Sequence, residues 1–206
     1  MPVSFKHKLI FIHIPKNAGT SIRESLIDID PDVIYWRYHH TAEEYNEFLT
    51  RTKDFFKFTF VRNPWDRTIS HYLYLKCDQH KKHRLEAWEH IQNLSFEDFI
   101  MSTVMQLDWL KVDGNLVPLD FIGRVETFDQ SIAELNRLAG IKLKPKHLRK
   151  GADQTFEHDR HGDTRKDKHY SNYYTPKTRK MVEERFHEEI KMFGYRFESE
   201  PQLPLL

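Results

Sequence analysis

The feature that most constrains this chain is a strand, loop and helix pattern that occurs more than once. Residues 8–14 (KLIFIHI) are rich in β-branched and aromatic side chains and end at Pro15. Residues 19–29 then place apolar side chains at helical spacing. A second apolar strand over residues 55–61 (FFKFTFV) leads into a helix over residues 65–76. Such alternation predicts an α/β fold with a central, mostly parallel sheet that is flanked by helices on both faces.

Short polar signals mark where the predicted helices begin and end. Asn63-Pro64 places a capping residue and then proline at the first helical position. The other expected elements follow along the chain: a strand over 33–36, a helix opened by the Thr41/Glu44 capping box and running to about Arg51, a helix from Ser95 to about Leu110, a strand over 119–125, a helix over 128–139 that stops at Gly140, and a last helix from Thr175-Pro176 to about Met192.

Composition narrows the class of protein. The 206 residues include 32 Lys and Arg against 31 Asp and Glu, so a strongly basic nucleic-acid binder is excluded and any anion site must be local. The single Cys77 rules out a disulfide within the chain and favours the cytoplasm. Apolar stretches fall well short of 18 residues, which predicts no membrane span.

The absence of a linker predicts one domain over residues 1–206, which ends in a tail at 197–206. Within it, residues 141–169 contain few apolar side chains and many charged ones. A loop of this length inside a domain is typical of a lid or a binding loop. The sequence therefore predicts a lid or a binding loop over residues 141–169, and a disordered segment with solubilising charges is the alternative.

A first anion-binding loop is predicted at Ile14-Pro-Lys-Asn-Ala-Gly-Thr-Ser21, between a strand and a helix. Backbone N–H groups and the positive end of the helix dipole meet at such a junction. Gly19 permits close approach, Thr20 and Ser21 add hydroxyl groups, and Lys16 adds a cation. In a P-loop kinase the lysine follows the second glycine, whereas here it precedes the only one. The loop therefore suits one phosphate or phosphosulfate group better than a triphosphate.

A second anion-binding loop is predicted at Val61-Arg-Asn-Pro-Trp-Asp-Arg-Thr-Ile-Ser70. Arg62 lies at the end of a strand and offers a guanidinium that matches phosphate oxygens, and Ser70 offers a hydroxyl group from the helix. Arg67 is a third cation, for which a solvated helix position is an equal alternative. The segment thus predicts a second, separate phosphate contact.

The two loops together resemble the sulfotransferases that use 3′-phosphoadenosine 5′-phosphosulfate (PAPS), in particular their carbohydrate-type branch with heparan 2-O- and chondroitin-like members and bacterial relatives. Pro15-Lys16-Asn17-Ala18-Gly19-Thr20-Ser21 is similar to that family's 5′-phosphosulfate loop, and Arg62-Asn63-Pro64-Trp65-Asp66-Arg67 through Ser70 to its 3′-phosphate motif. Residues 121–128 are similar to a later strand. The resemblance implies a three-layer, P-loop-like nucleotide-binding fold.

The resemblance also implies roles for individual residues. The 5′-phosphosulfate would lie on residues Pro15 to Ser21, and the 3′-phosphate on Arg62 and Ser70, with no metal required. Lys16 would stabilise the departing phosphate oxygen during in-line transfer of the sulfuryl group. Arg149-Lys150-Gly151 is similar to a segment that contacts the 3′-phosphate in cytosolic members, and a solvated basic stretch is its alternative. Arg124 and Glu126 are expected to form a buried ion pair.

The general base is sought among two histidines that precede the Thr41 helix. His40 is preferred over His39 because its spacing to Thr41 matches the bacterial pattern, and two surface histidines are the alternative. The acceptor is a hydroxyl or amine group, with carbohydrate among the candidates. Two other functions stay open at this point: a small-molecule kinase that uses ATP, and a nucleotide-binding module without activity.

Overall fold

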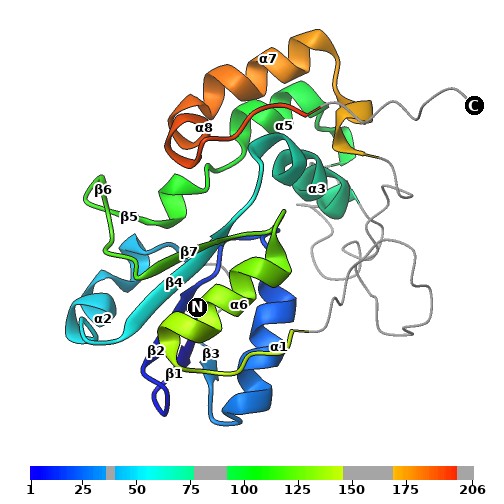
Figure 1. The fold of residues 1–206 in the computed structure, drawn as a ribbon. Helices are drawn as coiled ribbons and strands as arrows, with labels where there is room; N and C mark the ends of the chain where they lie inside the picture. The colour runs from blue at the N-terminus through cyan, green and yellow to red at the C-terminus, as the bar shows by residue number, and fades with distance from the viewer. Residues whose placement is uncertain (36–39, 77–91, 146–168, 199–206) are drawn as a thin grey trace, which may run out of the picture. The chain divides into compact units, whose positions relative to one another are not determined.

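A computed structural model describes residues 1–35, 40–76, 92–145 and 169–198 (Figure 1). They belong to two compact units. The first unit consists of Met1–Arg62 and Val104–Leu148, and the second of Asn63–Thr103 and Arg149–Leu206. The described part of the first unit carries a large sheet with helices, and that of the second is helical.

The sheet of the first unit has five strands in the order β3-β1-β2-β4-β7. Their bounds are Pro2–Ser4 for β1, Leu9–Ile12 for β2, Ile34–Tyr35 for β3, Phe56–Val61 for β4 and Phe121–Arg124 for β7. β2, β4 and β7 pair in parallel, whereas β1 pairs antiparallel with both β2 and β3. Only β1 therefore runs against the others in this sheet, which confirms the predicted mostly parallel sheet.

The sequence does not predict β1, because three residues that begin with proline carry too little pattern to indicate a strand. Pairing with its neighbours makes the strand: Val3 is in register with Ile10 of β2 and with Ile34 of β3. A tight turn joins β1 to β2, in which the Lys8 amide donates to the Phe5 carbonyl at 3.3 Å. β1 is thus a product of tertiary pairing.

Helices α1 (Gly19–Ile29) and α6 (Phe128–Ala139) lie side by side against the sheet in Figure 1, and both match their predicted bounds. α6 ends at Gly140, whose φ of 64° is left-handed, as the stop signal predicts. One hydrophobic cluster joins both helices to alternate residues of β2 and β4. Its members include Leu9, Phe11, Phe58, Phe60, Ile22, Leu26, Ile132 and Leu135.

Alternate residues of the same strands are buried on the opposite face as well. Ile10 and Ile12 of β2 and Val61 of β4 are each at most 1% exposed. A strand buried on both faces reads as a continuous apolar run, which is why β2 and β4 stand out in the sequence. These strands form the rigid support from which the two predicted anion-binding loops depart.

The predicted capping box at Thr41 forms. The Glu44 amide donates to the Thr41 hydroxyl at 3.4 Å, and the Glu44 carboxylate accepts from the Thr41 amide at 2.7 Å. The helix that follows starts as a 3₁₀ turn, η1 (Glu43–Tyr45), and continues as α2 (Asn46–Arg51), which ends where it was expected.

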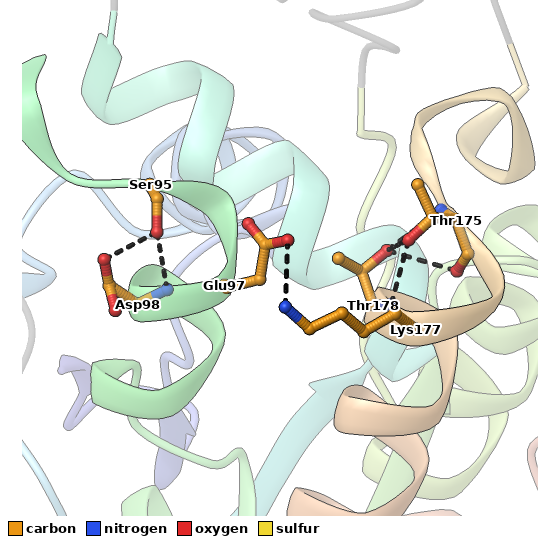
Figure 2. Close-up of polar contacts among 6 residues, drawn as sticks. All are labelled: Ser95, Glu97, Asp98, Thr175, Lys177 and Thr178. Atoms are coloured by element: carbon orange, nitrogen blue, oxygen red, sulfur yellow. Dashed lines mark hydrogen bonds and ion pairs between the residues drawn. The ribbon is translucent and has the colours of Figure 1, made fainter.

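The second unit contains α3 (Pro64–Lys76), α5 (Phe96–Ser102), η4 (Tyr170–Tyr173), α7 (Pro176–Arg185) and α8 (His187–Phe193). The predicted caps form: the Ser95 hydroxyl accepts from the Asp98 amide at 3.1 Å, and the Thr175 hydroxyl from the Thr178 amide at 3.2 Å. Figure 2 shows both caps, and an ion pair of 3.8 Å from Lys177 to Glu97 between the two helices they open. Capping signals therefore located these helix starts correctly.

Two predicted helices are too long. The helix from Ser95 ends at Ser102, because Thr103 has an extended backbone; the chain then forms a 3₁₀ turn, η3 (Leu107–Trp109), and a hairpin of β5 (Lys111–Val112) and β6 (Asn115–Leu116). The last helix breaks at Phe186, which is 1% exposed with φ of −104° and ψ of 21°. In both places long-range packing overrides the local helical pattern.

Candidate functional site

The loop after β2 bends sharply before α1 begins. Lys16 and Ala18 both have left-handed backbones, with φ of 71° and 59°. This conformation costs about 1–2 kcal/mol for a residue other than glycine. Such strain persists only where surrounding contacts hold it. Several of the contacts that hold this loop come from Asn17, which lies between the two strained residues.

Asn17 is completely buried and ties the loop to the sheet. Its Nδ2 donates to the carbonyl of Phe60, on β4, and to Oε1 of Gln106, each at 2.7 Å. Its backbone amide donates to the Ile14 carbonyl at 3.3 Å. Its Oδ1 is buried and has no hydrogen-bond partner among the described residues. The two hydrogen bonds of its Nδ2 group therefore connect the loop to other segments of the protein.

The start of α1 has the electrostatic character that the sequence predicts. The helix begins at Gly19 and has no acidic residue in its first turn, and Ala18 before it has no side-chain oxygen with which to cap the amides. The positive end of the helix dipole thus lies at the loop that carries Lys16. Thr20 and Lys16 are half-buried, and Ser21 is buried. The described residues of this first turn therefore place no negative charge at the start of α1.

Gly19 is required for a reason that the sequence does not reveal. Its backbone is not left-handed, yet a Cβ at this position would lie 1.6 Å from Nε2 of His13 and within 2.3 Å of two other ring atoms. The His13 ring stacks on Phe11, with the ring centroids 5.3 Å apart. The imidazole thus occupies the space that a side chain at position 19 would need, and it packs against the first residue of α1.

Gly19→Ala is expected to lower the free energy of unfolding by about 1–3 kcal/mol, because an overpacked site must displace the whole His13 ring. Urea unfolding of the single variants and of the double variant His13→Ala/Gly19→Ala measures it. The double variant should lose less stability than the sum of the two single changes. His13→Ala should give no such relief to Gly114→Ala, where a Cβ would meet nothing within 4 Å. Additive losses at positions 13 and 19 would show that the clash is not the cause.

Arg62 lies directly after β4 and contacts the loop after β2. Its guanidinium Nη1 donates to the Lys16 carbonyl at 3.0 Å. Gln106 holds its backbone from the other side: the Arg62 amide donates to Gln106 Oε1 at 2.9 Å, and Gln106 Nε2 donates to the Arg62 carbonyl at 2.8 Å. Since β2 and β4 are adjacent and parallel, both loops leave the same edge of the sheet, where α/β folds bind ligands.

His40 is half-buried and paired with an acidic residue on the same turn. Its Nδ1 lies 3.1 Å from Oε1 of Glu44, and its ring packs against Tyr45 with the centroids 5.4 Å apart. Hydrogen bonds from the Thr41 amide, assisted by the Thr41 hydroxyl and by His40, hold the pKa of the Glu44 carboxyl below its usual range. Glu44 is thus ionised at neutral pH, and its carboxylate faces Nδ1 of His40. His39 lies outside the described residues.

Ser70 and Arg67 belong to α3, in the second unit, and both are buried, at 5% and 2% exposure. The solvated position considered for Arg67 is therefore wrong. Asn63 caps α3 as predicted, because its Oδ1 accepts from the Trp65 amide at 3.1 Å. The Tyr174 hydroxyl donates to the Trp65 carbonyl at 2.8 Å, and burial raises the pKa of Tyr174 well above its usual value. The N-terminal half of α3 is thus firmly held within its unit.

Other sequence predictions have different outcomes. Arg124 and Glu126 are both exposed, so the expected burial of this pair is wrong: at the end of β7 the buried residue is Gly123, and Ile122 and Arg124 on either side of it are exposed. Arg149 and Lys150 lie outside the described residues, as does most of the 141–169 loop. Sequence reasoning missed His13 and Gln106. His13 has a local signal, since it lies just before the first loop, whereas Gln106 has none.

The described residues contain no group of three or more His, Cys, Asp or Glu side chains placed to hold a metal ion. Within the same residues, each helix is too short or too polar to cross a bilayer.

Comparison with known proteins gives one match. A model described as "Sulfotransferase family" matches residues 1–196, which is nearly the whole chain and spans both units. No curated protein and no solved structure matches.

Proposed function

This chain belongs to the sulfotransferase family, and we propose that it moves a sulfuryl group from PAPS to a hydroxyl or amine group of an acceptor. The observation that carries the proposal is the hydrogen bond of 3.0 Å between the Arg62 guanidinium and the Lys16 carbonyl. It places a strand-end arginine against a loop that carries a lysine and a helix N-terminus. A donor with phosphate groups at both its 5′ and 3′ positions needs two such cationic contacts close together.

We propose that the 5′-phosphosulfate of the donor lies on residues 15–21. The amides at the start of α1, the Thr20 and Ser21 hydroxyls and the Lys16 ammonium group supply the donors and the positive charge there. Arg62 binds the 3′-phosphate, and its planar guanidinium suits the oxygens of a phosphate group. Ser70 and the Arg149-Lys150 segment are the other proposed contacts to the 3′-phosphate.

In the proposed reaction His40 Nε2 takes the proton from the acceptor while the acceptor oxygen or nitrogen bonds to sulfur. The bond between sulfur and the 5′-phosphate oxygen breaks, and Lys16 neutralises the charge that gathers on that oxygen. Glu44 keeps His40 in the tautomer with a basic Nε2, which is the arrangement of an oriented general base. In this proposal His40 acts on the acceptor side of the transferred sulfuryl group, and Lys16 acts on the leaving-group side.

We further propose that both compact units form one sulfotransferase domain, since the family match extends over residues 1–196 and so covers parts of each. Carbohydrate is the proposed acceptor class, on the resemblance to carbohydrate-type members. The proposed location is the cytoplasm, because Cys77 is the only cysteine. Acceptor-dependent release of 3′-phosphoadenosine 5′-phosphate (PAP) from PAPS tests the activity. Stabilisation by ADP but not by PAP would favour a kinase instead.

Arg62→Ala is expected to weaken PAP binding by about 2–3 kcal/mol, or about 30- to 150-fold, because the 3′-phosphate loses a charge-assisted contact. Binding of AMP, which lacks the 3′-phosphate, should change much less. Titration calorimetry with both nucleotides measures the difference. Arg137→Ala is the control, since Arg137 is exposed on α6 and pairs with Glu134 at 2.6 Å. Equal losses for PAP and AMP in Arg62→Ala would contradict the 3′-phosphate assignment.

A further inference from the structure

The side-chain amide of Gln106 makes the hydrogen bonds that a peptide group would make at the end of β4. It is completely buried, and its amide pairs with both the N–H and the C=O of Arg62, at 2.9 and 2.8 Å. A neighbouring strand would offer a peptide group the same pair of bonds. The conformation of Arg62 is therefore held by a side chain that comes from outside the two loops.

The same amide also reaches the first loop. Gln106 Oε1 accepts from Asn17 Nδ2 at 2.7 Å while it accepts from the Arg62 amide. A second path joins the loops directly, from the Arg62 guanidinium to the Lys16 carbonyl. One buried oxygen atom is therefore shared by the two segments that carry Lys16 and Arg62. All of these residues belong to the first unit.

We infer that Gln106 is a positioning residue that sets the spacing between the 5′-phosphosulfate loop and Arg62, an inference that rests on the proposed function. A ligand with phosphates at both ends gains from two sites at a preset spacing, because it need not order them on binding. A ligand with a single phosphate gains nothing from that spacing. Gln106 thus favours nucleotides that carry both a 3′- and a 5′-phosphate over those with a 5′-phosphate alone.

The test compares binding of PAP and AMP to Gln106→Met, which keeps the length of the side chain and removes its hydrogen bonds. The ratio of PAP affinity to AMP affinity is expected to fall about tenfold. This is the size of effect expected when one charge-assisted contact, that of Arg62 with the 3′-phosphate, is no longer held in position before binding. AMP binding should change little, since Asn17 still bonds the Phe60 carbonyl and keeps the first loop in place. A variant that is only less stable would lose both ligands in the same proportion.

Asn136 offers a matched control in the same unit. Its side-chain amide also pairs with both backbone groups of one residue, Leu143, at 2.9 and 2.8 Å. Asn136→Leu removes a comparable pair of bonds outside the two loops. It should reduce thermal stability and leave the ratio of PAP to AMP affinity at the wild-type value.

A second variant keeps the inference testable if Gln106→Met does not fold. Asn17→Ala removes the donor that faces Gln106, and it also removes a buried oxygen that lacks a partner among the described residues, which limits the cost to stability. AMP affinity should fall as well, because the first loop also loses its bond to the Phe60 carbonyl, and PAP affinity should fall further. Equal losses of PAP and AMP in these variants would overturn the inference alone. Failure of the wild-type chain to bind PAP would overturn the proposed function and the inference with it.

Discussion

His40→Ala is expected to lower kcat about 10²- to 10⁴-fold, the usual contribution of a general base, while PAP affinity stays near the wild-type value. The imidazole is proposed to act on the acceptor proton only, so that the nucleotide loses no contact. Single-turnover kinetics at saturating acceptor, together with calorimetry for PAP, separates the two effects. A proportional loss of kcat and PAP affinity would point to a role in binding or folding.

Two histidine variants serve as controls. His187→Ala changes an exposed histidine on α8 and should leave kcat unchanged. His39→Ala should have a mild effect, because the proton transfer is proposed to rest on His40. Nearly full kcat in His40→Ala would dismiss His40 as the base. A large loss of kcat in His39→Ala instead would assign the role of the base to His39.

Lys16→Met is expected to lower kcat about 10²- to 10³-fold, as for the loss of one electrostatic group that stabilises a developing negative charge. Methionine keeps most of the length of the side chain and removes its positive charge. Affinity for PAPS should fall less than kcat, because the amides at the start of α1 and Arg62 still hold the nucleotide. The comparison of kcat with the dissociation constant of PAPS measures this separation.

Lys8→Met is a closely matched control. Lys8 also has a left-handed backbone, with φ of 51°, and it lies in a turn next to β2. Its ammonium group pairs with Asp54 at 2.9 Å on the surface, where ion pairs contribute little to stability. Wild-type kcat in Lys8→Met would show that the loss in Lys16→Met does not come from replacing a lysine in a strained turn. Equal losses in both variants would contradict the proposed role of Lys16.

Local sequence patterns were enough to predict most of the elements that support the site. The bounds of α1 and α6 follow from apolar spacing and, for α6, from Gly140. The caps at Thr41, Asn63, Ser95 and Thr175 were recognised from short motifs of neighbouring residues. These signals act between residues that are close in the chain, so each is complete within one segment. The first anion-binding loop, with Lys16 before Gly19, was likewise predicted from residues that are close in the chain.

Contacts between distant segments could not be predicted in this way. Asn17 and Gln106 are 89 positions apart, and Arg62 and Gln106 are 44 apart. No neighbouring residue in the sequence indicates that the side-chain amide of Gln106 bonds both backbone groups of Arg62 at the end of β4. The space that Gly19 leaves for His13 and the burial of Arg67 also depend on packing that the chain acquires only when it folds.

The sequence by itself determined which residues carry charge and where each loop leaves its strand, because strand and helix signals are local. Only the tertiary structure decided how Arg62 is held against the loop of Lys16, since the bonds of Asn17 and Gln106 require β2 and β4 to lie side by side. A buried amide must find its hydrogen-bond partners inside the folded protein, wherever they lie in the chain.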